Sequence, residues 1–137
     1  MGIRKIIKEE INDFDWVEEH EFTHDEVIQH IKDNNITEWT FGGHWGGYLD
    51  LGWTPITNLG NLESVGGFLF LEETPITSLG NLQSVGDDLY LEGTPITNLG
   101  NLESVVGDLY LSGTPISKTH SEEQIRQSVQ VGGGIYM

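Results

Sequence analysis

The sequence predicts a solenoid of stacked coils, built on a short parallel β-sheet of about five strands, with an N-terminal helical cap and a short C-terminal cap helix. Three observations predict this fold class: a 20-residue repeat fills the middle of the chain, leucines alternate with other residue types in each repeat, and helix-start signals flank the repeats. We expect a helical cap over residues 1–45, repeats over residues 46–116, and a cap helix with a last strand over residues 117–137.

The N-terminal cap is predicted to contain two helices. Apolar residues near the start of the chain fall at helical spacing, and Thr23 to Glu26 fit a capping box that opens a second helix ending near Asn34. The four tryptophans all lie in the first 53 residues, where they suit a bulky lid over the first coil. The apolar residues of the first helix are Ile3, Ile6, Ile7, Ile11 and Phe14, and the tryptophans are Trp16, Trp39, Trp45 and Trp53.

Each repeat reads G-G-x-L-x-L-x-x-T-P-I-T-x-L-G-N-L-x-S-V and predicts a short strand followed by a return path. Leu69 and Leu71 alternate with other residue types, as in a strand with one buried face, and Pro75 then ends the pairing because it lacks an N–H group. Along the return path, apolar residues recur at every third position, so that one side of it is apolar. These residues are Ile76, Leu79, Leu82 and Val85.

This pattern resembles the leucine-rich repeat family, whose general motif is L-x-x-L-x-L-x-x-N-x-L. The resemblance covers residues 46–116 and implies a leucine-rich-repeat solenoid. The chain departs from the motif in two ways: threonine replaces the turn asparagine, and glycine replaces the first leucine in all but the last repeat. The threonines are Thr54, Thr74, Thr94 and Thr114; the other positions are Gly46, Gly66, Gly86 and Val106.

A second cap and a fifth strand are predicted after the repeats. Ser121 begins a helix in the manner of a capping box, with Ile125 and Val129 facing inward. Residues 131–137 match the start of a repeat in type, so Ile135 takes the place of Leu109 after an interval of 26 residues. The far edge of this strand stays unpaired, and we expect a homodimer through it.

Length, charge and composition exclude several classes of function. A chain of 137 residues with 36% apolar residues supports one domain with its caps. The net charge of −16 opposes binding to nucleic acid or to an anionic membrane. The lack of cysteine excludes thiolate zinc sites and thiol catalysis. No stretch suits a membrane helix or a signal-peptide core, so we expect a cytoplasmic protein.

One motif points to metal chemistry. Residues 20–24 read H-E-x-x-H, and a third histidine follows as in the metzincin zinc peptidases, which this motif resembles. That geometry needs a glycine bend where Val27 stands, and the helix is predicted to begin only at Thr23. We therefore expect no metal, no cofactor and no catalysis. The alternative is a zinc metallopeptidase acting through His20, Glu21, His24 and His30.

The alternation also predicts a partner-binding face on the outer side of the sheet. Because Leu69 and Leu71 are expected to face inward, the residues beside them face outward and align into columns when the coils stack. The first column contains Asp50, Phe70, Tyr90, Tyr110 and Tyr136. The second contains Tyr48, Phe68, Asp88 and Asp108, and the third contains Glu72, Glu92 and Ser112.

These columns favour a non-catalytic protein-binding function. Residues 33–117 include eleven acidic residues and no lysine or arginine, which would steer a basic partner. The partner could be a nucleic-acid-binding or defence protein of a host, because residues 3–16 and the chain's ending resemble small bacteriophage-encoded proteins. A self-associating assembly protein is an alternative, and aromatic ladders also stabilise sheets without any partner.

Overall fold

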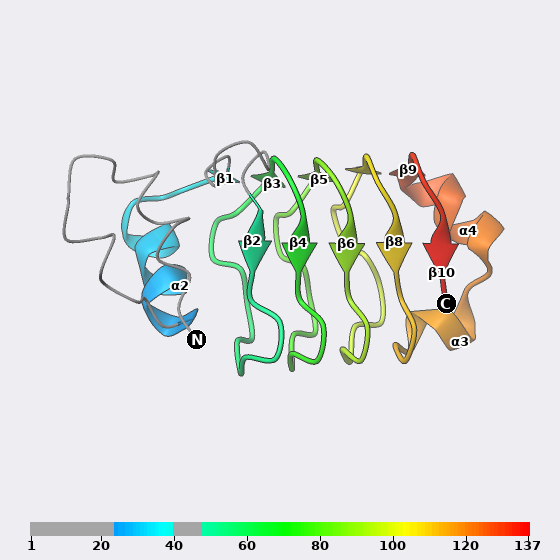
Figure 1. Ribbon diagram of the computed structural model, residues 1–137, viewed down its shortest axis with the longest axis horizontal. Coiled ribbons are helices and arrows are strands. Elements are labelled where there is room, and N and C mark those ends of the chain that lie inside the picture. Colours follow the sequence, from blue (N-terminus) through cyan, green and yellow to red (C-terminus); the bar gives the residue numbers. More distant parts are fainter. Residues whose placement is uncertain (1–23, 40–47) are drawn as a thin grey trace.

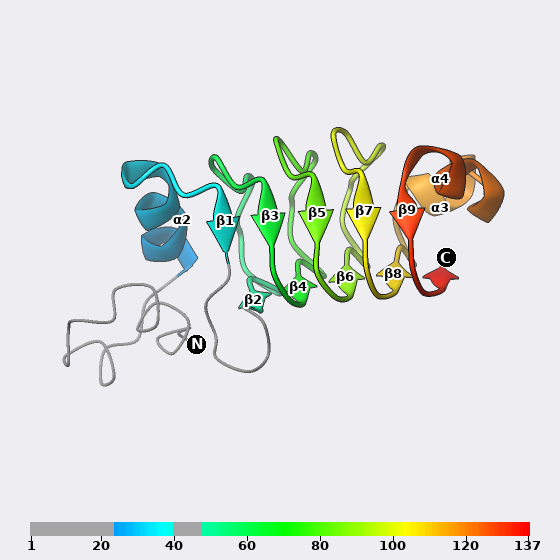
Figure 2. The same ribbon diagram turned by 90° about the horizontal axis from the view of Figure 1, so that it is seen from above.

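The repeats form a solenoid in which two parallel sheets enclose one hydrophobic core (Figure 1, Figure 2). The computed structural model describes residues 24–39 and 48–137. Each sheet has five strands, and each coil contributes one strand to each sheet. The repeat solenoid is thereby confirmed. The predicted first helix, together with Trp16 and Trp45, lies outside the described residues.

The predicted sheet, here called the leucine sheet, faces the viewer in Figure 1. Its strands pair in parallel at the repeat interval, so that Leu49 lies beside Leu69, and Ile135 lies beside Leu109. The fifth strand is thus confirmed despite its longer interval. The strands are β2 (Leu49–Asp50), β4 (Leu69–Phe70), β6 (Leu89–Tyr90), β8 (Leu109–Tyr110) and β10 (Ile135–Tyr136).

A second sheet, here called the valine sheet, lies on the adjoining side of each coil and is seen face-on in Figure 2. The prediction of one sheet was incomplete, because Val85 was assigned to a turn-like return path. Each strand has two residues, only one of them buried, so the sequence shows no alternation there. The strands are β1 (Glu38–Trp39), β3 (Ser64–Val65), β5 (Ser84–Val85), β7 (Ser104–Val105) and β9 (Gln130–Val131).

Three of the repeat threonines, Thr74, Thr94 and Thr114, lie buried at the turn after the leucine sheet, and Thr54 is partly buried at the same turn of the first coil. In the second coil, the hydroxyl of Thr74 donates a 2.8 Å hydrogen bond to the carbonyl oxygen of Leu71. Thr94 and Thr114 make the same bond to Leu91 and Leu111. A short polar side chain can satisfy nearby backbone groups in this way. The threonine therefore fixes the turn while filling little volume.

Helix α2 (His24–Asp33) covers the first coil, which confirms the second predicted cap helix. Val27 and Ile31 on α2 are fully buried, as is Trp39, whose indole Nε1–H donates a hydrogen bond to the carbonyl oxygen of Tyr48. Trp39 therefore serves as the expected lid residue. Trp53 does not, because its side chain is 77% exposed. No helix in the described ranges is long and apolar enough to cross a membrane.

Helices α3 (Ile116–Thr119) and α4 (Glu122–Ser128) close the other end of the solenoid. The predicted capping box is confirmed, with the Ser121 and Gln124 side chains each bonded to the other residue's backbone N–H. The aliphatic side chains of the last coil are covered by this cap. Val131 and Ile135 are each only 8% exposed, since α4 supplies buried Ile125 to the same core.

Arg126 of α4 occupies the edge that a further coil would use. Its Nη1 donates to the carbonyl oxygen of Val131 at 3.0 Å, and its Nη2 donates to that of Gly133 at 2.8 Å. In the preceding coil, the equivalent carbonyl oxygens of Val105 and Gly107 accept backbone N–H groups. One guanidinium group thus replaces two N–H donors of an absent neighbouring strand.

Candidate functional site

The outer side of the leucine sheet, here called the ladder face, carries a continuous stack of aromatic rings. The ring centroids of Phe70 and Tyr90 are 4.7 Å apart, and those of Tyr90 and Tyr110 are 4.5 Å apart. Tyr136 continues the stack at 4.9 Å from Tyr110. In-register strand pairing produces this spacing, which matches the distance of about 4.8 Å between strands. The predicted column is assembled, with Asp50 beside Phe70 at its start.

The stack changes what the rings can offer to a ligand. Tyr90 and Tyr110 each have a ring on both sides, so their faces are covered and their edges and hydroxyl groups remain. Nucleobases and sugars use open aromatic faces. Tyr136 ends the stack among the described residues and is 50% exposed. The ladder face therefore suits the side chains of a protein better than a stacked base.

Asp88 and Asp108 hold neighbouring coils together. One carboxylate oxygen of Asp88 accepts the backbone N–H of Asp108 at 2.7 Å, and one of Asp108 accepts that of Gly134 at the same distance. Their second oxygens accept the hydroxyl groups of Tyr90 and Tyr110, at 3.2 and 3.4 Å. These two predicted partner-binding residues are partly buried and have hydrogen-bond partners within the fold, so their column also stabilises the stacking of the coils.

The hydroxyl groups of Tyr90 and Tyr110 stay protonated. Burial, the hydrogen bond to Asp88 and the charge of that carboxylate raise the pKa of Tyr90. Desolvation, followed by the charges of Asp108 and Asp88, also raises the pKa of Tyr110. Both phenols therefore remain donors toward the carboxylates across the ordinary pH range.

Tyr48 and Phe68 contribute unequally to the ladder face. Tyr48 is partly buried and packs against the core beside Trp39. Phe68 is also partly buried, and its ring lies 5.9 Å from that of Phe70 in the same coil. Phe68 therefore widens the aromatic stack, whereas Tyr48 belongs mainly to the core.

Glu72 and Glu92 line the turn at the end of the ladder face, in the predicted third column. The Glu72 carboxylate lies directly against Gly52 of the first coil, where a Cβ atom would collide with it. Burial, then the negative charge of Asp50, raises the pKa of Glu72, and the charges of Glu92 and Glu73 act in the same direction. Since residues 33–117 contain no lysine or arginine, no cation of the repeats neutralises this group of carboxylates.

Trp53 is a candidate residue that the sequence reasoning missed. It has φ of 61°, a left-handed backbone conformation that bulky residues rarely adopt. The equivalent residues are Glu73 at 57°, Gly93 at 71° and Gly113 at 74°. A signal existed in the sequence, since the repeat alignment places a tryptophan where later coils have glycine. The exposed indole lies outside the core that tryptophan usually prefers.

No protein-family model, curated protein or solved structure matches this chain. Its function must therefore be inferred from its own side chains. The features that bear on function are the ring stack, the carboxylates beside it and the exposed indole.

The metalloprotease motif is only partly within the described residues. Helix α2 begins at His24, and His20 and Glu21 lie outside the described chain. His30 lies on α2 near its C-terminal end, where its Nδ1 is 3.1 Å from the side-chain nitrogen of Asn34. Within residues 24–39 and 48–137, no three histidine, aspartate or glutamate residues are grouped so as to hold a metal ion.

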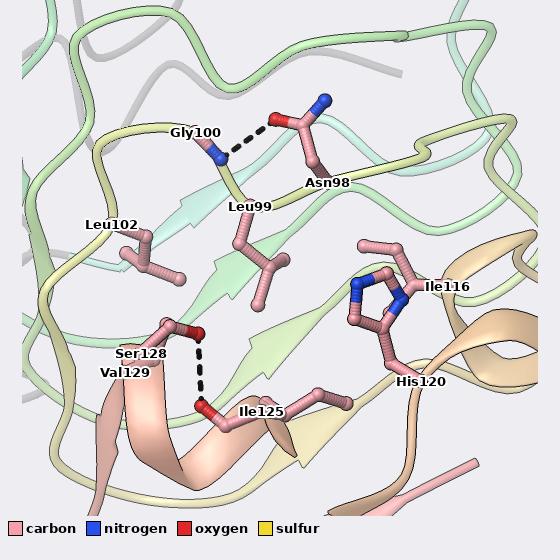
Figure 3. A pocket seen from close by; sticks show the side chains of 9 residues that line it. All are labelled: Asn98, Leu99, Gly100, Leu102, Ile116, His120, Ile125, Ser128 and Val129. Atoms are coloured by element: carbon pink, nitrogen blue, oxygen red, sulfur yellow. Dashed lines mark hydrogen bonds between the residues drawn. The ribbon is translucent and has the colours of Figure 1, made fainter.

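A cavity of about 240 Å³ lies between the loop before β7 and helix α4 (Figure 3). Its polar groups bond to one another: Gly100 N–H donates to Asn98 Oδ1, and Ser128 Oγ–H donates to the carbonyl oxygen of Ile125. Its lining includes no acidic residue, lysine or arginine, and its one imidazole is that of His120, whose Nδ1 lies 2.8 Å from Thr119 Oγ1. The lining residues are Asn98, Leu99, Gly100, Leu102, Ile116, His120, Ile125, Ser128 and Val129.

Proposed function

We propose that this chain is a non-catalytic binding module of the leucine-rich repeat type, whose ladder face binds a basic protein. The observation that carries the proposal is the combination of a continuous aromatic stack with carboxylates that have no cation among the repeats. Aromatic anchors surrounded by charge are typical of protein interfaces. An acidic field accelerates association with a basic surface.

The leucine-rich repeat assignment is supported by the repeat itself. Its L-x-L strand, its buried turn residue and its parallel stacking correspond to the family's general pattern, with threonine serving at the turn. The valine sheet and the glycine at the first leucine position set this chain apart from that pattern.

The partner we propose is a basic nucleic-acid-binding or defence protein of a host cell. The net charge of −16 opposes binding to nucleic acid itself, but it complements a surface that binds phosphate. The resemblance of both chain ends to small phage-encoded proteins favours a host protein as the target and the host cytoplasm as the setting.

Two double variants, each of which removes two negative charges, test the proposal. Immobilised protein should retain a basic protein from bacterial lysate, and the double substitution Glu72→Gln/Glu92→Gln should weaken retention at least fivefold. Glu63→Gln/Glu103→Gln removes the same charge from residues next to the valine-sheet strands and should leave retention within twofold. Equal retention by both double variants would show that the ladder face is not the binding surface.

Self-association is the alternative, and one observation favours it. The backbone N–H groups of Ile135 and Met137 form no hydrogen bond within the described part of the chain. Such an edge can pair with a second strand. Light scattering tests it: a dimer strengthened by salt supports pairing through β10, whereas a monomer at about 100 µM at every salt concentration contradicts it.

A further inference from the structure

The exposed tryptophan of the first coil occupies a position that disfavours it. A residue with a Cβ atom is strained at positive φ, and Trp53 has φ of 61°. Burial does not compensate for this strain, because the side chain is 77% exposed. Two later coils use glycine at the equivalent position, so the fold itself does not need an indole there. Backbone outliers of this kind are often retained for function.

Two carboxylates lie against Gly52, the residue that precedes this tryptophan. The Glu72 side chain packs against Gly52, the residue immediately before Trp53. The Asp50 carboxylate accepts the N–H of the same glycine at 3.1 Å, and the backbone N–H of Trp53 bonds to the carbonyl oxygen of Glu72 at 2.8 Å. The first coil thus combines an accessible indole with two carboxylates at its turn. Burial and the neighbouring negative charges raise the pKa of Glu72, which is the response of a carboxylate that lacks a cation.

We infer that Trp53, with Asp50 and Glu72, forms an anchor site for an arginine side chain of the basic partner. A guanidinium group is planar, weakly hydrated and always charged, so it can stack on an indole while it bonds to a carboxylate. The charge of the repeats selects a cation over an apolar group, since residues 33–117 have eleven acidic residues and no basic ones. This inference rests on the proposed function and specifies where its partner is held.

The anchor occurs once among the four equivalent turns. Glu73 occupies the same place in the second coil, and Gly93 and Gly113 occupy it in the next two. A partner would therefore be fixed at the first coil and extend along the carboxylates of Glu72 and Glu92. This gives the otherwise repetitive ladder face one orientation for binding.

Titration with a fluorescein-labelled nona-arginine peptide at about 150 mM salt tests the anchor. Trp53→Gly should weaken binding at least fivefold, and its urea midpoint should rise, because glycine relieves the strained backbone. Val106→Gly is the matched control, since it also removes an exposed apolar side chain without changing charge. It should leave peptide affinity within twofold of the wild type.

Each other outcome overturns a specific part of the inference. If Trp53→Gly binds like the wild type while Glu72→Gln/Glu92→Gln binds weakly, the anchor is wrong and the acidic ladder face remains the binding surface. If Trp53→Gly lowers the urea midpoint, the indole has a packing role and the anchor is again wrong. If the wild type binds nona-arginine no better than a nona-serine peptide, both the anchor and the proposed basic partner are wrong.

Discussion

Asp88 and Asp108 show how one residue type can serve two coils. Each carboxylate accepts a backbone N–H from the next coil and a tyrosine hydroxyl from its own. The next coil must leave room for that carboxylate, and glycine does so: a Cβ atom at Gly107 or Gly133 would collide with it. The aspartate and the following glycine are therefore one structural unit.

Glu72 makes folding stability depend on pH in an unusual direction. Its pKa is raised from 4.5, and that of Asp87 is raised from 3.8 by burial and the neighbouring charge of Asp88. Between the unfolded and folded pKa values, the folded state binds more protons, so stability falls as pH rises through that window. We expect a larger free energy of unfolding in urea at about pH 5 than at about pH 7.

Glu72→Gln should reduce this pH dependence, because the glutamine stays neutral. Glu103→Gln, on an exposed residue beside the valine sheet, should leave it unchanged. A free energy of unfolding that rises steadily from pH 5 to pH 7 in the wild type would contradict the raised pKa of Glu72.

At the scale of an element, helix α4 acts through one side chain as well as through its apolar face. Arg126 is held by Glu122, whose carboxylate is 3.0 Å from the guanidinium Nε, and it bonds to two carbonyl oxygens of the last coil. The helix thus packs its apolar face against the core and provides hydrogen-bond donors for two carbonyl oxygens at the edge of the last coil. Arg126 thereby satisfies carbonyl groups at β9 and just after it, whereas the N–H groups of Ile135 and Met137 at the β10 edge form no hydrogen bond in the described part of the chain.

Arg126→Ala should lower the free energy of unfolding by about 1–2 kcal/mol, since two carbonyl oxygens lose a charged donor. Glu122→Ala is the control, because it removes only an exposed ion pair and should cost at most about 0.5 kcal/mol. Urea titration of both variants measures the difference. Equal effects would mean that water replaces the guanidinium at no cost.

The elements that could be predicted from the sequence are those in which a local residue pattern matches the burial of the side chains. The leucine strands, the capping box at Ser121 and the last strand at Ile135 were all predicted. The valine sheet was missed because a two-residue strand has no period to detect. Trp53 and Arg126 were missed because their roles depend on a dihedral angle and on long-range carbonyl groups, neither of which has a local signature.

At the scale of the whole molecule, the core is a single column in which each coil depends on its neighbours. Leu91 lies in the third coil and is fully buried, whereas Tyr90 stands on the ladder face with a ring on each side. In a one-dimensional stack, a defect in a middle coil weakens two interfaces at once. The central coils should therefore control the stability of the solenoid.

Leu91→Ala should lower the free energy of unfolding by about 2–5 kcal/mol through loss of apolar contacts and creation of a cavity. Tyr90→Ala should cost less, because its ring is only partly buried and its loss leaves no enclosed void. Denaturant titrations of the two variants give the comparison. Equal losses would show that the ladder contributes as much as the core.

The guanidinium of Arg126 bonds to backbone carbonyl groups, which every coil possesses, and not to side chains particular to the last one. Helix α4 with Arg126 could therefore cap any coil of the repeat in the same way. A gene duplication of one repeat, inserted before it, would lengthen the aromatic ladder by one ring, about 4.8 Å, and leave every existing contact intact. The length of the ladder face can therefore change during evolution by whole repeats, while the same C-terminal cap is kept.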